Sequence, residues 1–268
     1  MYGGKLALST IAERIGHSNF SNIRELSLVN QSIKSFDLDP IESLDNLRSL
    51  NLENNQLTSL EGLLELNRLR ILCVNSNKIT SLHSTHDDVQ YPVLTNLHVL
   101  QLASNTIANL GPLQLHRFPS LKALFLQNND ISSLEGLEEL PSLIELVLDR
   151  NKIKYIAEKD IASLKNILEL HLEENRLRYL PDLSALVSLH RLFLGNNRIL
   201  DLKELVKLTD LTLLIEISFI NNPISRKANY TIAIIQAVPN IRVIDRCDIP
   251  SDERTRALDE LNTQWNPI

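Results

Sequence analysis

The sequence has few of the residues that mark several common classes of protein. Its 268 residues include only 2 cysteines, 7 glycines and 10 prolines, and aromatic residues make up 4% of the chain. Two cysteines cannot build the disulfide framework of a small secreted domain, and so few glycines and prolines exclude a collagen-like or low-complexity chain. We therefore predict an aliphatic core and a reducing, cytoplasmic location.

Long apolar runs and an excess of positive charge are also missing. No apolar run reaches the roughly 18 residues that a membrane helix needs, and residues 1–10 lack the apolar core of a signal peptide. The formal net charge of −6 gives the chain no global positive field for nucleic acid. The sequence thus predicts neither a membrane nor a nucleic acid as partner.

One pattern of aliphatic residues and a single asparagine recurs along most of the chain. Residues 167–177 show it, with apolar residues at the first, fourth, sixth and eleventh places and asparagine at the ninth. The ninth residues lie 22 to 28 residues apart, and eight of nine are asparagine, Gln31 being the exception. The units begin at Ile23, Leu47, Leu69, Leu97, Leu121, Leu143, Ile167, Leu189 and Leu214.

This pattern resembles the leucine-rich repeat, which implies an α/β solenoid of about nine repeats. A curved parallel sheet would line its concave face, with short helices and 3₁₀ turns on the convex face. Residues 23–224 would form the repeats, residues 1–22 an N-terminal helical cap ending near Gly16, and residues 225–268 a C-terminal cap. The fourth and sixth residues of each unit would enter the core, and the buried asparagine amides would bond the backbone of two repeats.

The end of the chain resembles the cap of intracellular leucine-rich repeat proteins whose units have about 22 residues. Residues 222–224 (Asn-Pro-Ile), 239–245 (Pro-Asn-Ile-Arg-Val-Ile-Asp) and 252–257 (Asp-Glu-Arg-Thr-Arg-Ala) carry this resemblance. The class includes a regulatory subunit of protein phosphatase one. Residues 170–257 are most similar to the leucine-rich repeat-containing protein nine family, long proteins associated with cilia and flagella. That family has glycine where this chain has Arg246, so the cap turn is expected to differ.

An insertion at about residues 82–95 lengthens one repeat. It contains His83, His86, Asp87 and Asp88, which are residue types that bind metal ions. Polar side chains in a loop are more often only solvated, so we predict no metal site and keep metal binding as the alternative.

Motifs for catalysis and for cofactors are missing from the sequence. It contains no nucleophile elbow and no glycine-rich nucleotide loop, so no cofactor is predicted. His171 lies between Glu169 and Glu173 and could act as a base, but nothing identifies a nucleophile or an oxyanion donor. We predict that the protein is not an enzyme, with an enzyme that uses His171 and these acids as the less favoured alternative.

The third, fifth and seventh residues of each unit face away from the core, so they are the candidate binding residues. The apolar candidates are Ile71, Val99, Phe125, Val147 and Phe193. The polar candidates are Glu145, Asp149, Glu169, His171 and Glu173. Lateral packing along the sheet is the alternative reason for the aromatic residues.

Phe125 and Phe193 would lie about 14 Å apart, three strands along the sheet. Two aromatic anchors beside acidic residues favour a protein partner with a basic and apolar segment. We predict a non-catalytic protein–protein interaction scaffold that binds this segment on its concave face. The family resemblance implies a ciliary or cytoskeletal assembly, and the alternative is a regulatory subunit of a protein phosphatase.

Overall fold

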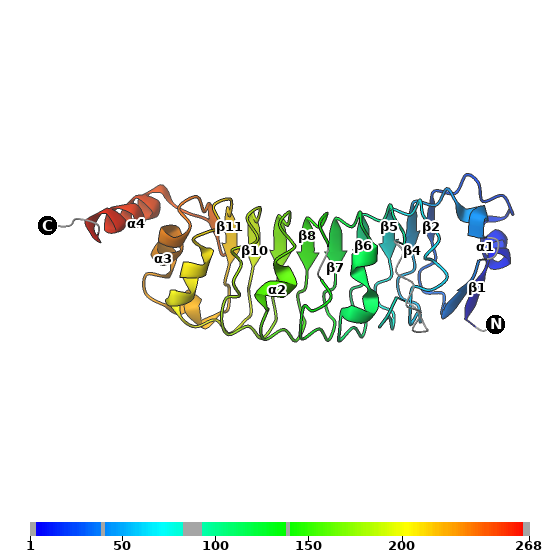
Figure 1. The fold of residues 1–268 in the computed structure, drawn as a ribbon, viewed down its shortest axis with the longest axis horizontal. Coiled ribbons are helices and arrows are strands. Elements are labelled where there is room, and N and C mark those ends of the chain that lie inside the picture. Colours follow the sequence, from blue (N-terminus) through cyan, green and yellow to red (C-terminus); the bar gives the residue numbers. More distant parts are fainter. Residues whose placement is uncertain (1–3, 39–40, 83–92, 138–139, 265–268) are drawn as a thin grey trace.

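The structure, a computed structural model, describes residues 4–38, 41–82, 93–137 and 140–264. Its elements follow one another in single file, with the two ends of the chain at opposite ends of a long solenoid (Figure 1). Most of the insertion at 82–95 lies outside the described residues. The alternative metal site at His83, His86, Asp87 and Asp88 lies there too.

One sheet of 11 strands runs along the described part of the chain. Neighbouring strands are parallel, except that the last two form an antiparallel hairpin. This arrangement confirms the predicted parallel-sheet solenoid. In order, the strands are β2 (Glu25–Ser27), β4 (Ser49–Asn51), β5 (Ile71–Cys73), β6 (Val99–Gln101), β7 (Ala123–Phe125), β8 (Glu145–Val147), β9 (Glu169–His171), β10 (Arg191–Phe193), β11 (Glu216–Ser218), β12 (Val243–Ile244) and β13 (Cys247–Asp248).

The strands pair so that equivalent residues of successive repeats lie side by side. Leu124 is aligned with Leu146, and Leu146 with Leu170. These fourth residues are fully buried, as predicted, and each contributes about 1.5–3 kcal/mol of hydrophobic burial. Because side chains alternate along a strand, the third and fifth residues form rows on the opposite face.

The ninth-position asparagines join neighbouring repeats from within the core. The side-chain amide of Asn151 donates to the carbonyl oxygens of Leu126 and Leu148, each at 3.0 Å. Its Oδ1 accepts the N–H of Ile131 at 3.0 Å. This confirms the predicted bonding to two repeats, and it recurs at Asn55, Asn77, Asn105, Asn129, Asn175, Asn197 and Asn222.

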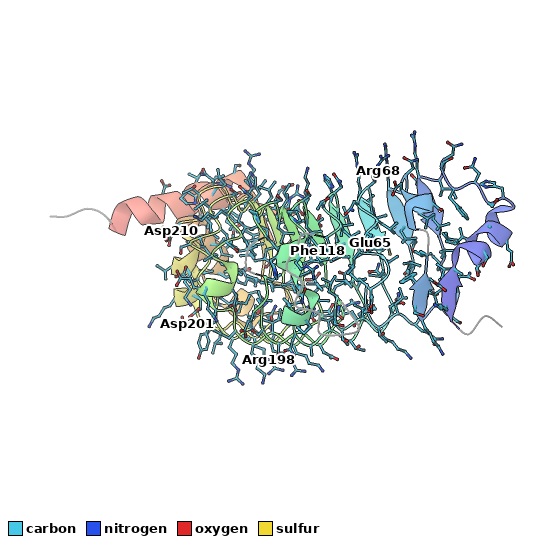
Figure 2. The ribbon with its side chains drawn as sticks, turned by 45° about the vertical axis from the view of Figure 1, so that its right-hand side comes forward. Glu65, Arg68, Phe118, Arg198, Asp201 and Asp210 are labelled. Carbon is cyan, nitrogen blue, oxygen red and sulfur yellow. The ribbon has the colours of Figure 1, made fainter. Side chains whose placement is uncertain are left out.

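Short helical segments cover the side of the solenoid opposite the sheet, as predicted. Phe118, at the end of one of them, lies inside the body of the solenoid (Figure 2). Among the described helices, none combines the length and apolar character that a membrane crossing requires. The segments are η1 (Ile41–Leu44), η2 (Gly111–Leu113), η3 (Leu115–Arg117), α2 (Glu158–Ile161) and η4 (Leu202–Leu208).

The N-terminal end combines a helix with a second, two-stranded sheet. Helix α1 (Leu8–Ile15) buries Ile11 against the core and ends at Gly16, whose φ of 78° is left-handed. Strand β1 (Lys5–Ala7) pairs in parallel with β3 (Ser35–Asp37). The sequence predicts the helix and its end but not β1, because three residues are too few to show a period.

The C-terminal end packs η5 (Pro223–Arg226), α3 (Tyr230–Ala237) and α4 (Ser251–Gln264) after the last repeat. Asp245 ties this end to the sheet, because its Oδ1 accepts the N–H of Phe219 at 2.7 Å. Its Oδ2 accepts the Tyr230 hydroxyl at 3.0 Å. Burial and then the Asp245 charge raise the pKa of Tyr230 far above its ordinary value, so the hydroxyl stays protonated and remains a donor.

The hairpin between β12 and β13 turns at Asp245 and Arg246, whose φ angles are 52° and 67°. Two positive φ angles are typical of a type I′ turn, which favours glycine at its second place. Arg246 therefore adopts the left-handed backbone that glycine would adopt more easily.

Candidate protein-binding surface

The predicted binding residues gather on the sheet face, by which we mean the face carrying the third, fifth and seventh residues of each repeat. The pairing of β5 to β10 places them in three rows. The third-position row holds Ile71, Val99, Glu145 and Glu169, the fifth-position row Phe125, Val147, His171 and Phe193, and the seventh-position row Asp149 and Glu173.

The apolar residues of the sheet face differ in how much surface they offer. Ile71 is 42% exposed, and Val99, Phe125 and Phe193 are half-buried. Val147 is aligned between Phe125 and His171 and is only 8% exposed. Lateral packing thus covers Val147, so the open apolar surface is carried mainly by its neighbours.

His171 and Phe193 stack against each other across β9 and β10. Their ring centroids are 4.4 Å apart and their planes are inclined by 31°. The Nε2 atom of His171 is buried and has no hydrogen-bond partner among the described residues, and it lies 3.7 Å from Glu169 Oε2. The two stacked rings therefore form an aromatic pair on the sheet face.

Arg191, which the sequence analysis did not select, pairs with acids on both sides along the third-position row. Its Nη1 lies 2.7 Å from Glu169 Oε1, and its Nε lies 3.5 Å from Glu216 Oε2. Glu169, Arg191 and Glu216 occupy equivalent places of three successive repeats, and this alternation of charge in the sequence could have predicted the two ion pairs. Arg191 balances part of the acidic charge, and Glu145 lies beside Glu169 on the side away from Arg191.

Glu145, Glu169 and His171 offer ligand atoms within 4.8 Å of one another and could together hold a metal ion. Arg191 already supplies a positive charge to Glu169. A metal ion at this place would therefore compete with the Arg191 guanidinium for the Glu169 carboxylate.

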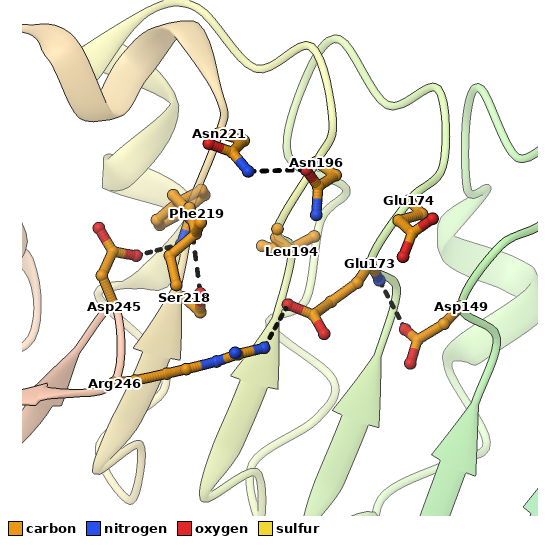
Figure 3. A network of polar contacts seen from close by, with 12 residues as sticks. Asp149, Glu173, Glu174, Leu194, Asn196, Ser218, Phe219, Asn221, Asp245 and Arg246 are labelled. Carbon is orange, nitrogen blue, oxygen red and sulfur yellow. Dashed lines mark hydrogen bonds and ion pairs between the residues drawn. The ribbon is translucent and has the colours of Figure 1, made fainter.

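The two acids of the seventh-position row, Asp149 and Glu173, lie on neighbouring repeats (Figure 3). Asp149 Oδ1 accepts the N–H of Glu173 at 2.7 Å. Burial raises the pKa of Asp149, while this hydrogen bond and the nearby His171 act to lower it. The Arg246 guanidinium reaches back from the C-terminal hairpin, with Nη2 3.6 Å from Glu173 Oε1. The sequence could not reveal this contact, because Arg246 lies outside the repeats.

Comparisons with known proteins identify the family to which these repeats belong. Two family models match the chain, one described as "Leucine-rich repeat" at residues 170–266 and one as "Leucine rich repeat" at residues 95–153. The chain is a leucine-rich repeat protein. The repeat pattern of the sequence is therefore confirmed at residues 95–153 and 170–266.

A U2 small nuclear ribonucleoprotein A′ of Emericella nidulans is 30% identical over 168 residues, which are 63% of this chain and 61% of the relative. A protein phosphatase 1 regulatory inhibitor subunit PPP1R7 homolog of Arabidopsis thaliana is 29% identical over 189 residues, which are 70% of this chain and 54% of the relative. The chain thus spans between half and two thirds of the length of these relatives.

Among solved structures, an internalin C2 of Listeria monocytogenes has a similar fold. Its TM-score is 0.63 at 24% identity, and the match covers 79% of this chain and 91% of the internalin chain. This likeness supports the leucine-rich repeat solenoid.

Proposed function

We propose that this scaffold binds a basic and apolar protein segment on its sheet face. In this proposal residues 23–224 carry the binding repeats, and residues 1–22 and 225–268 cap the two ends. The proposal rests on one observation, the alignment of Phe125, His171 and Phe193 beside the acidic row of Asp149 and Glu173.

The aromatic and acidic residues would act on different parts of the partner. Phe125 and Phe193 stand three strands apart, about 14 Å, which suits two anchor side chains of one helix or strand. Glu145 and Glu173 would attract lysine or arginine side chains between these anchors. Burial of an aromatic anchor dominates the affinity of such an interface, whereas the exposed charges mainly set its specificity.

The experiment compares partners captured from a lysate of the source cells by the wild type and by a Phe125→Ala, Phe193→Ala variant. Val187→Ala, Val206→Ala is the matched control, because it removes two exposed apolar side chains that lie outside the sheet face and belong to no proposed binding surface. The proposal expects one set of partners to be lost only from the sheet-face variant, with thermal unfolding showing that both variants fold. Equal capture by the wild type and the sheet-face variant would overturn it.

A phosphatase-regulating role is the second candidate, favoured by the 29% identity to the Arabidopsis phosphatase regulatory subunit homolog. It makes a separate prediction that needs no lysate. Purified protein phosphatase 1 catalytic subunit should bind the chain and change its activity towards a phosphorylated substrate. Unchanged phosphatase activity at saturating chain would remove this candidate and leave the sheet-face proposal standing.

The place of action that we propose is the cytoplasm, in a ciliary or cytoskeletal assembly. The cysteine content and the resemblance of residues 170–257 to the leucine-rich repeat-containing protein nine family support it. Fluorescence microscopy of the tagged chain in ciliated cells tests this place, and a diffuse signal that avoids the cilium and the cytoskeleton would contradict it.

A further inference from the structure

A basic edge lies outside the sheet face, formed by the residues that follow the asparagines of three successive repeats. The Arg176 N–H donates to the carbonyl of Ile153, and the Arg198 N–H to the carbonyl of Leu177, both at 2.8 Å. Equivalent residues of these repeats are therefore neighbours, about 5 Å apart. We define the basic edge as Lys152, Lys154, Tyr155, Arg176, Arg178, Tyr179, Arg198 and Leu200.

The basic edge exposes aromatic surface that the fold does not use. Tyr155 is 70% exposed and Tyr179 is 66% exposed. They are the two aromatic residues among the exposed large apolar side chains of the described chain, and Leu200 beside them is 55% exposed. Exposed apolar side chains gathered at one place mark an interaction site more often than scattered ones do.

Most positive charges of the basic edge lack a partner within the described chain. Lys152 pairs with Asp130 at 2.5 Å. No described ion pair or side-chain hydrogen bond involves Lys154, Arg176, Arg178 or Arg198. The basic edge therefore carries an excess of positive charge, although the net charge of the whole chain is −6. The acidic groups that would complement it must come from another molecule.

We propose that the basic edge is a second binding surface, for an acidic protein segment that also carries apolar side chains. Arginine and tyrosine are the residue types most enriched at the energetic centres of protein interfaces. Leu200 offers an exposed aliphatic contact that a nucleic acid backbone does not match. An acidic protein segment therefore fits this surface better than RNA does.

The test measures binding of the whole chain to a fluorescein-labelled synthetic peptide of glutamate and leucine, by fluorescence anisotropy. We expect saturable binding that Arg176→Glu, Arg178→Glu, Arg198→Glu weakens about tenfold, since each exposed ion pair contributes little alone. Tyr155→Ala, Tyr179→Ala should weaken binding to a similar extent. A peptide with lysine in place of glutamate should not bind at the basic edge.

The matched control reverses three arginines at the other margin of the solenoid, Arg24→Glu, Arg48→Glu, Arg70→Glu. These are the second residues of three successive repeats and, like the arginines of the basic edge, are exposed. Figure 2 shows Arg198 and Arg68, the latter two residues before Arg70, at opposite margins. The control triple should change the affinity less than about twofold.

Four results would overturn the proposal. These are no binding of the acidic peptide, equal weakening by the two triple variants, tighter binding of oligo-uridylate than of the peptide, or self-association of the chain that the first triple abolishes. The Phe125→Ala, Phe193→Ala variant should bind the acidic peptide as tightly as the wild type does. The two surfaces are therefore tested independently, and a failure of the basic-edge proposal would not contradict the sheet-face proposal.

Discussion

Gly195 lies directly beneath the carboxylate of Glu173, so that a Cβ added to Gly195 would meet Glu173 Oε1 at 2.5 Å. The absence of a side chain lets Glu173 extend over β10 towards Arg246 of the C-terminal hairpin (Figure 3). One glycine on the sheet face thus determines where an acidic group of the neighbouring repeat is presented.

Gly195→Ala should displace the Glu173 carboxylate and break its ion pair with Arg246. The unfolding free energy should fall by less than about 1 kcal/mol, because the clashing atom is the end of a flexible side chain and the ion pair is exposed. Denaturant unfolding measures this, with Gly111→Ala as control, since a Cβ at Gly111 meets no atom within 4 Å. A loss of several kcal/mol would show that the Glu173 side chain cannot move aside.

Asn151→Ala should destabilise the solenoid by about 2–4 kcal/mol, because it leaves buried carbonyl groups and the Ile131 N–H without partners. Asn166→Ala is the control, since this exposed asparagine makes one bond, to the Pro141 carbonyl at 2.8 Å. Asn166→Ala should lower the unfolding free energy by less than about 1 kcal/mol. Similar unfolding midpoints for the two variants would contradict the structural role of the asparagine row.

Arg246→Gly should stabilise the protein by about 0.5–1 kcal/mol. Glycine relieves the left-handed backbone strain at φ 67°, and this gain exceeds the small contribution of the exposed ion pair to Glu173. Arg246→Ala provides the control, because it removes the ion pair but keeps a side chain at positive φ. Thermal unfolding should rank glycine above wild type and alanine below it, and the reverse order would contradict the type I′ turn.

These positions show how far the sequence alone could reach. Leu146 and Asn151 stand at the fourth and ninth places that recur in every repeat, so their burial and the rows of the sheet face follow from the repeat pattern. Arg246 belongs to a hairpin outside the period, and its contact with Glu173 depends on a side-chain length that no pattern records. Val147 was expected to be open, but its exposure is set by its neighbours Phe125 and His171 across the strands.

The charged ladder of the third-position row was partly visible in the sequence. Glu169, Arg191 and Glu216 stand at equivalent places, so their adjacency was predictable from the repeat. The bonds that Arg191 makes to both acids depend on the rotamer of a long side chain, which the repeat pattern does not fix.

Asp149→Asn should stabilise the protein at neutral pH, because burial raises the folded-state pKa of Asp149 and the charged form is therefore disfavoured in the folded state. The amide keeps the acceptor for the Glu173 N–H, as Asn75 does for the Ala103 N–H at 2.8 Å at the same place of another repeat.

The stability difference between Asp149→Asn and wild type should shrink as the pH falls from neutrality towards about 4, where the carboxyl becomes protonated in both states. Thermal unfolding across this pH range measures it. Asp210→Asn, at an exposed position, controls for the change in net charge. A difference that widens on acidification would contradict the raised pKa.

His171→Phe should raise the unfolding free energy by about 1 kcal/mol, because it preserves a ring against Phe193 and removes a buried nitrogen that has no hydrogen-bond partner in the described part of the chain. His190→Phe is the control, since the Nδ1 of His190 makes a contact of 2.6 Å with the Ser188 carbonyl that phenylalanine would lose.

The His171→Phe variant also separates two roles of His171 in binding. If the partner rests on the ring surface that His171 and Phe193 share, His171→Phe keeps its affinity within about threefold and His171→Ala weakens it by about tenfold. Equal weakening by both substitutions would show that the partner bonds the imidazole nitrogens instead.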